Sequence, residues 1–237
     1  MHGIRNVQVT DVDRLSRFEA FSKLPTPELR TLASALALSD FRRYEIILND
    51  AGLASGANIL LRGIARITCL GAHGARMTVA LLAPGPIPEF PSPLVSRSGF
   101  QCEAYNNCRV GSVSWNDFNR ILANSSDAAR KTFHDNDMKQ WYRMLMRSAS
   151  FLHLELHERI GLTLLELCSE FGIEDVRGTL LRVSFSHKDI ASLVGASRPR
   201  VTEHLARLER EQLLIRQGRQ IVVCVDKLAA SMSQHST

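Results

Sequence analysis

Residues 186–223 read SHKDIASLVGASRPRVTEHLARLEREQLLIRQGRQIVV, and this stretch decides the fold of the C-terminal part of the chain. Ser186 is placed to cap a short helix, and Asp189 takes the role that glutamate plays in a capping box. Gly195 supplies the left-handed conformation that commonly ends such a helix. Ser197 is placed to cap a second helix. The stretch therefore predicts a helix, a four-residue turn and a second helix.

The second helix has one apolar face and one polar face. Val201, Leu205 and Leu208 recur at helical spacing and are expected to face the core. The first turn then presents its remaining side chains to solvent. In helices that lie in the major groove of DNA, the residues at this end contact the base edges. The predicted DNA-binding residues are Ser197, Arg198, Pro199, Arg200, Thr202 and Glu203 on this helix, Lys188 before it and Arg219 after it.

A hairpin follows the second helix. Residues 213–215 and 220–225 alternate in character around Gln217-Gly218-Arg219, which predicts two strands and a turn that presents Arg216 and Arg219. The whole chain has a net charge of +5, but the local excess of basic residues is more informative. Residues 186–220 hold seven Lys and Arg against four Asp and Glu, an excess of three. A winged helix-turn-helix is the predicted motif.

The first half of the chain has a different texture. Short apolar runs punctuated by glycine and proline extend from residue 42 to about residue 114, in the segments 44–50, 57–70, 75–82, 100–105 and 108–115. Such runs predict strands joined by turns in a small antiparallel sandwich or barrel. From residue 116 to about residue 171 only Gly161 interrupts the helical spacing of apolar residues. The sequence thus predicts a β-rich part followed by helices.

One predicted helix carries a continuous apolar stripe. A stripe of this kind on a long helix packs either against its own domain or against its copy in a dimer. The residues of the stripe are Met138, Trp141, Tyr142, Leu145, Met146, Ala149 and Leu152.

The segment IASLVGASRPRVTEHLARLEREQLLIRQGRQIVV resembles the DNA-binding domain of the cyclic-AMP receptor protein and fumarate-nitrate regulator (CRP/FNR) family of bacterial transcription factors. The positions in register with the family pattern are Gly195, Ser197, Arg198, Val201, Leu205, Leu208, Glu209 and Gly218. The resemblance implies an α+β chain with a cyclic-nucleotide-binding-like β jelly roll in residues 1–122, a dimerisation helix in residues 123–153 and a winged helix-turn-helix domain in residues 154–237. It also implies a homodimer that binds double-stranded DNA and contacts RNA polymerase.

The resemblance gives Arg198 the role of reading a guanine, which matches the two hydrogen bonds that arginine donates to guanine O6 and N7. Pro199 stands where the family often has a glutamate, and Glu203 where it often has an arginine. Arg200 is left with two roles, a phosphate contact or a base contact. The expected DNA site therefore differs from the family's best-known sequence.

The predicted sensor departs from the family's cyclic-nucleotide cassette. That cassette holds the ribose with a Gly-Glu pair and the cyclic phosphate with an Arg followed by Ser or Thr. Residues 84–90 read PGPIPEF, so the candidate pocket residues are Gly85, Glu89, Arg97 and Ser98, with the arginine one position out of register. Because an uncompensated buried phosphate is costly, this argues against cyclic AMP bound in the usual mode.

The sequence leaves the identity of any effector or cofactor open. The first cysteine is Cys69, which excludes the family's iron–sulfur cluster with its N-terminal thiolates. Cys69 and His73 are weak candidates for haem ligands, and Cys102 and Cys108 for a redox switch. A haem- or redox-sensing regulator of the same family is the alternative.

The sequence does not point to an enzyme, a metal site or a membrane protein. It holds no nucleotide-binding or hydrolase motif, and Glu155 between His153 and His157 does not complete a metalloprotease motif. Charged residues in the first thirty positions argue against a signal peptide, so a cytoplasmic protein is expected. A second alternative is a protein-interaction module with a degenerate sensor fold, but the retained arginines of the second helix favour DNA binding.

Overall fold

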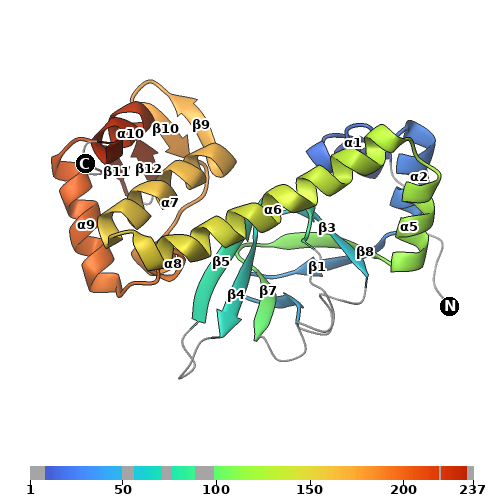
Figure 1. Ribbon diagram of the computed structural model, residues 1–237, viewed down its shortest axis with the longest axis horizontal. Helices are drawn as coiled ribbons and strands as arrows, with labels where there is room; N and C mark the ends of the chain where they lie inside the picture. Colours follow the sequence, from blue (N-terminus) through green and yellow to red (C-terminus); the bar gives the residue numbers. More distant parts are fainter. Residues whose placement is uncertain (1–8, 50–55, 71–75, 89–98, 219, 234–237) are drawn as a thin grey trace. The chain divides into compact units, whose positions relative to one another are not determined.

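The chain divides into two compact units between Leu145 and Met146, within one long helix. We call them the N-terminal unit and the C-terminal unit. The computed structural model describes residues 9–49, 56–70, 76–88, 99–218 and 220–233. Figure 1 shows the elements of both units along the chain.

Two four-stranded antiparallel sheets form the β-rich part of the N-terminal unit (Figure 1). The first sheet has the order β1-β8-β3-β6, with β1 at Ala37–Phe41, β8 at Cys108–Val113, β3 at Ala57–Arg62 and β6 at Gly85–Pro86. The second has the order β2-β7-β4-β5, with β2 at Ile46–Leu48, β7 at Phe100–Ala104, β4 at Ala65–Leu70 and β5 at Arg76–Leu82. The predicted β-rich N-terminal region is confirmed, and β1 and β6 lie outside the segments that the sequence predicts as strands.

One core lies between the two sheets. Leu60 and Val110 come from the first sheet and Ile67 and Cys102 from the second, and all four side chains are buried in one cluster. Met144 from the long helix joins the same cluster. Strands whose alternate side chains meet in this way form a two-layered core.

A second core lies between the first sheet and the helices of the N-terminal unit. These helices are α1 (Val9–Ser16), the 3-10 helix η1 (Glu19–Phe21), α2 (Thr26–Ala35), α5 (Trp115–Ala123) and α6 (Asp127–His153). Phe133 of α6 stacks on Phe21 with ring centroids 6.0 Å apart and meets Phe118 edge-on at 5.0 Å. These aromatic contacts, with Ile59 from the sheet, anchor the first part of α6 to the unit.

The C-terminal unit combines helices with one small antiparallel sheet. Its helices are the last turns of α6, then α7 (Leu156–Phe171), α8 (His187–Val194), α9 (Arg198–Arg210) and α10 (Val225–Ser233). Its sheet has the order β11-β12-β10-β9, with β11 at Leu214–Gln217, β12 at Gln220–Val223, β10 at Gly178–Leu181 and β9 at Gly172–Asp175. The predicted helix-turn-helix and hairpin are confirmed as α8, α9 and the β11–β12 pair.

Candidate nucleic-acid interface

The first helix of the motif, α8, begins and ends as its sequence predicts. The Ser186 hydroxyl accepts a hydrogen bond from the backbone N–H of Asp189 at 3.2 Å, and the Asp189 carboxylate accepts from the backbone N–H of Ser186 at 2.8 Å. Together they form the predicted capping box. Gly195 ends the helix with φ +61°, in the left-handed region, and its N–H donates to the Ala191 carbonyl.

The second helix, α9, buries one face and exposes the other. Val201 and Leu205 are completely buried, and Leu208 is nearly so. Ser197 occupies the N-cap position, but its side chain makes no capping hydrogen bond, so that part of the prediction is wrong. A capping hydroxyl accepts from the second or third N–H of the helix, and Pro199 at the second position has none. All six predicted DNA-binding residues of this segment are exposed: Ser197, Arg198, Pro199, Arg200, Thr202 and Glu203.

Arg198 and Arg200 stand in the first turn of α9, on the side away from the buried face. Within the described part of the chain, neither guanidinium forms an ion pair or a hydrogen bond. A guanidinium always carries its charge and holds five N–H donors in a planar fork. The first turn of α9 therefore exposes two cations whose donors are free for a ligand with acceptor groups.

The hairpin after α9 is a wing tied back to the motif. Strands β11 and β12 pair up to Gln217 and Gln220, and Gly218 at the tip has φ +61°. Arg219 lies outside the described residues, so its predicted role is untested. Arg216 donates from Nη1 to His187 Nε2 at 2.5 Å, and its Nε lies 3.3 Å from Oε1 of Glu209 on α9.

His187, the first residue of α8, joins this wing to α9. Its Nδ1 lies 2.7 Å from the Thr202 hydroxyl, which in turn donates to the Arg198 carbonyl at 2.9 Å. Partial burial, and then the charges of Arg216 and Arg198, lower the pKa of His187 below that of a free histidine. The neighbouring Lys188, a predicted DNA contact, is exposed. His187 was not predicted as a site residue, because its partners stand far from it along the chain.

The last turns of α6 hold the helix-turn-helix in place. Arg147 is buried, pairs with the carboxylate of Glu166 on α7 and donates from Nη1 to the Leu193 carbonyl at 3.3 Å. Burial lowers the pKa of Arg147. The Leu193 carbonyl belongs to the C-terminal turn of α8, where a cation is favourable to the helix dipole. Arg147 thus connects three helices of the C-terminal unit.

The predicted dimer stripe of α6 is mostly exposed. Trp141 is the member that packs partly buried against the core between the two sheets, and Ala149 is half-buried. Tyr142 and Leu145 are 62% and 65% exposed. The other exposed members are Met138, Met146 and Leu152.

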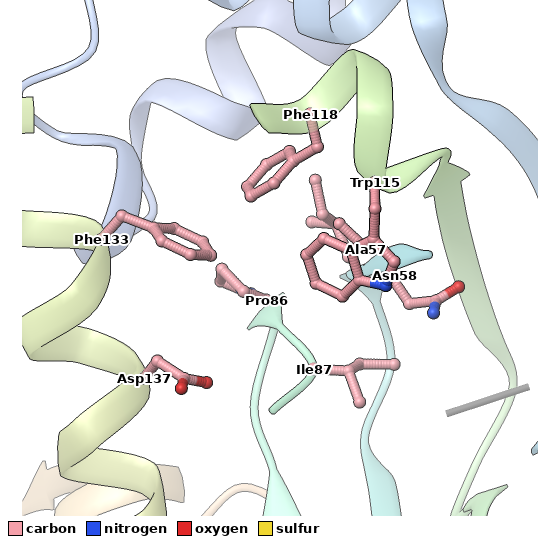
Figure 2. A pocket seen from close by; sticks show the side chains of 9 residues that line it. Ala57, Asn58, Pro86, Ile87, Trp115, Phe118, Phe133 and Asp137 are labelled. Carbon is pink, nitrogen blue, oxygen red and sulfur yellow. The ribbon is translucent and has the colours of Figure 1, made fainter. Parts of the chain in front are cut away.

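The predicted effector-pocket residues are only partly described. Glu89, Arg97 and Ser98 lie outside the described residues, as does His73. Gly85, in β6, has φ +152°, and a β-carbon there would meet no atom of the described residues within 4 Å. A cavity of about 20 Å³ lies near β6 (Figure 2), which is room for about one water molecule and too little for a nucleotide. Its lining residues are Ala57, Asn58, Ile59, Pro86, Ile87, Trp115, Phe118, Phe133 and Asp137.

The cysteines named as redox candidates are buried. Burial raises the pKa of Cys108 to about 11 and raises that of Cys102 further. Because the thiolate is the reactive form, burial disfavours reaction at both thiols. Among the residues that the structure describes, no cluster of three or more His, Cys, Asp or Glu could hold a metal ion. No helix within the described ranges is long and apolar enough to cross a membrane.

Sequence comparison matches the motif to a domain family and the chain to a relative. Residues 158–230 match the family model of the Crp-like helix-turn-helix domain. The chain is also 23% identical over 191 residues to the global nitrogen regulator of Synechococcus elongatus, an alignment that covers 79% of this chain and 86% of that protein.

Solved structures extend the similarity beyond the motif. FixK2 from Bradyrhizobium japonicum has a TM-score of 0.69 at 20% identity, over 82% of this chain and 96% of that chain. A CRP family transcriptional regulator from Thermus thermophilus has a TM-score of 0.63 at 23% identity, over 82% and 96%. Residues 158–230 are therefore a Crp-like helix-turn-helix domain, in a chain with the fold of the CRP/FNR family of transcription regulators.

Proposed function

We propose that this protein is a homodimeric transcription regulator that binds a specific DNA sequence through α9 and the β11–β12 hairpin. The observation that carries the proposal is the first turn of α9. Arg198 and Arg200 are exposed there with no ion pair among the described residues, while Val201 and Leu205 fix the helix to the core. A helix held in this way presents its N-terminal side chains to the major groove.

Arg198 is the proposed base-reading residue. It stands one position after the N-cap, where a bidentate contact to a guanine is within reach of a helix that lies in the groove. Arg200 contacts either a base or a phosphate. Lys188, Ser197, Thr202, Glu203 and Arg219 complete the proposed contact surface.

The proposed dimer uses the exposed stripe of α6. Tyr142 and Leu145 are mostly exposed in the single chain, and burying large apolar side chains against a second copy would remove them from water. Two copies joined along α6 would present two recognition helices to a two-fold DNA site. The N-terminal unit is proposed as the sensor, for an effector other than cyclic AMP in the usual cassette. The protein would then act in the cytoplasm on double-stranded DNA, with RNA polymerase as a further partner and no catalytic role.

The test is a selection of duplexes from a random library with the purified chain, followed by affinity measurements on the enriched sequence and on random DNA. Arg198→Ala is expected to weaken binding to the enriched sequence by roughly 1 to 3 kcal/mol and to change binding to random DNA less. Arg210→Ala is the matched control, since it removes the same charge from the last turn of α9. No enrichment would refute the proposed function, and equal losses on both duplexes would reduce Arg198 to a phosphate contact.

A further inference from the structure

A directed chain of hydrogen bonds runs from the wing to the recognition helix through His187. Arg216 has only donors, so the Nε2 atom of His187 that faces it at 2.5 Å must be the acceptor. The hydroxyl proton of Thr202 is used on the Arg198 carbonyl at 2.9 Å. The Thr202 oxygen is therefore free to accept from His187 Nδ1 at 2.7 Å. Each donor in this series of hydrogen bonds faces an acceptor only if Nδ1 of His187 carries the ring proton.

This series of hydrogen bonds therefore requires a neutral imidazole at His187. A protonated histidine carries hydrogens on both nitrogens, so Nε2–H would point at the guanidinium of Arg216, donor against donor and cation against cation. The contact to Arg216 would then break, while the contact to Thr202 would remain. In consequence, protonation of one side chain removes the contact between His187 and Arg216, while the ion pair of Arg216 with Glu209 remains.

The charges around His187 come from each element packed against it. Arg216 on β11 and Arg198 on α9 disfavour the protonated ring, and Glu209 on α9 favours it. On its own helix, Lys188 and Asp189 are the neighbouring charged groups. Partial burial adds to the two arginines, and the pKa of His187 is lowered. The neutral form is thus the resident form in the free protein near pH 7.

We propose that neutral His187 is a positioning residue that sets Arg216 and Thr202 for sequence-specific binding, and that its protonation lowers the discrimination between target and random DNA. This rests on the proposed function, because it concerns the same DNA-facing surface. The two consequences of protonation have opposite signs. An added positive charge strengthens attraction to any DNA, whereas Arg216 loses one of the two contacts that fix its position and keeps the one to Glu209. The informative quantity is therefore the ratio of the affinity for target DNA to the affinity for random DNA.

The first experiment follows the His187 ring in the free full-length protein by long-range proton–nitrogen NMR. The His187 signals are assigned as those that are missing from the spectrum of His187→Gln. The expected result is a neutral ring with its proton on Nδ1 and a pKa below the ordinary histidine value of about 6.5. A neutral ring with its proton on Nε2 would overturn the proposal whatever the DNA measurements show. The measured pKa also sets the pH values for the second experiment.

The second experiment compares affinities for the enriched and a random duplex at about pH 8 and at a pH about one unit below the measured pKa, where circular dichroism shows the fold intact. For the unmodified protein the ratio of affinities is expected to fall about threefold to tenfold, the range for losing one hydrogen-bonded contact. His187→Gln offers one acceptor and one donor without titrating, so its ratio should stay high at both pH values. His187→Ala should be low at both.

The outcomes separate the two proposals. A ratio that does not change with pH in the unmodified protein, with the enriched sequence still bound tightly, refutes the role of His187 and leaves the proposed function standing. If the affinity ratio falls equally in His187→Gln, the pH dependence belongs to another group, and the role of His187 is refuted as well. Absence of any enriched sequence at about pH 8 refutes the proposed function itself.

Discussion

Phe151, near the end of α6, lies directly against Gly195 in the turn of the helix-turn-helix: a β-carbon on residue 195 would stand 2.8 Å from ring carbon Cε1. Gly195 is also in the left-handed region, with φ +61°. The turn therefore has two separate reasons to require glycine, one in the backbone and one in the packing.

Gly195→Ala tests both reasons, and Gly218→Ala isolates the first. Gly218 has the same φ of +61°, and among the residues that the structure describes, its chain neighbours apart, none would lie within 4 Å of a β-carbon there. We expect Gly218→Ala to lower the free energy of unfolding by about 1 kcal/mol, the cost of a left-handed alanine, and Gly195→Ala to lower it by at least 1 kcal/mol more, since Phe151 must shift. Calorimetry of the full-length chain measures both. Equal effects would show that Phe151 gives way freely.

Arg147→Ala is expected to destabilise the C-terminal unit by about 1 to 3 kcal/mol. The substitution removes the hydrogen bond to the Leu193 carbonyl and the ion pair with the Glu166 carboxylate, and Glu166 is only partly exposed. Lys131→Ala is the control, because it breaks the exposed Lys131–Asp135 pair of the same helix and should change stability by less than about 0.5 kcal/mol. Urea denaturation gives both values, and similar losses in the two variants would contradict the role assigned to Arg147.

Stability is expected to fall as the pH is lowered from about 7.5 towards about 5. The pKa values of His187 and His204 are lowered in the folded protein, chiefly by partial burial. An unfolded histidine with a pKa of about 6.5 binds a proton first, so the unfolded state takes up more protons in this window. The stabilising contribution is thus present above about pH 6.5 and is lost below it.

The contribution of the two histidines to the pH dependence of stability is measured with the His187→Gln and His204→Gln variants. Each should flatten the dependence of the unfolding free energy on pH, because the substituted side chain binds no proton. Asp175, whose pKa is held at about 2 by Arg177, acts in a separate window below its ordinary value and does not enter this comparison. An unchanged slope in the double variant would assign the dependence to the other histidines.

Leu145→Glu is expected to turn the proposed dimer into monomers in sedimentation. Leu145 is 65% exposed, so the single chain should keep its fold while a buried charge would disfavour the paired one. Arg143→Glu, an exposed site on α6 outside the stripe, is the control for introducing the same carboxylate. A Leu145→Glu protein that remains dimeric would place the interface elsewhere. Trp141 is unsuitable for this test, because it packs in part against the core of its own unit.

The helix-turn-helix could be predicted because its signals are local. The capping pair Ser186 and Asp189, the left-handed Gly195 and the spacing of Val201 and Leu205 each act within a few residues, and each is confirmed. Strands β1, β6, β9 and β10 were not predicted, and β1 and β9, which read ALSDF and GIED, contain no buried residue. Without an apolar alternation, a strand is defined by its partners, and these follow only from the assembled sheet.

The candidate site was predicted for single residues and missed for their connections. Arg198 and Arg200 are exposed where the helical period puts them. His187 and Arg216 are 29 residues apart and meet only because α8, α9 and β11 pack together. No spacing rule links residues on three elements. The roles of Glu89, Arg97 and Ser98 stay predictions, since they fall outside the described residues.

Pro199 has a consequence for the DNA sequence itself. Its ring stands between Arg198 and Arg200 in the first turn of α9 and offers neither a donor nor an acceptor. In the major groove, the one base feature that an apolar group recognises is the methyl group of thymine. The base pair opposite Pro199 in the enriched duplex is therefore expected to be either a thymine-bearing pair in fixed orientation or free to vary, and not a pair chosen through its hydrogen-bonding edge.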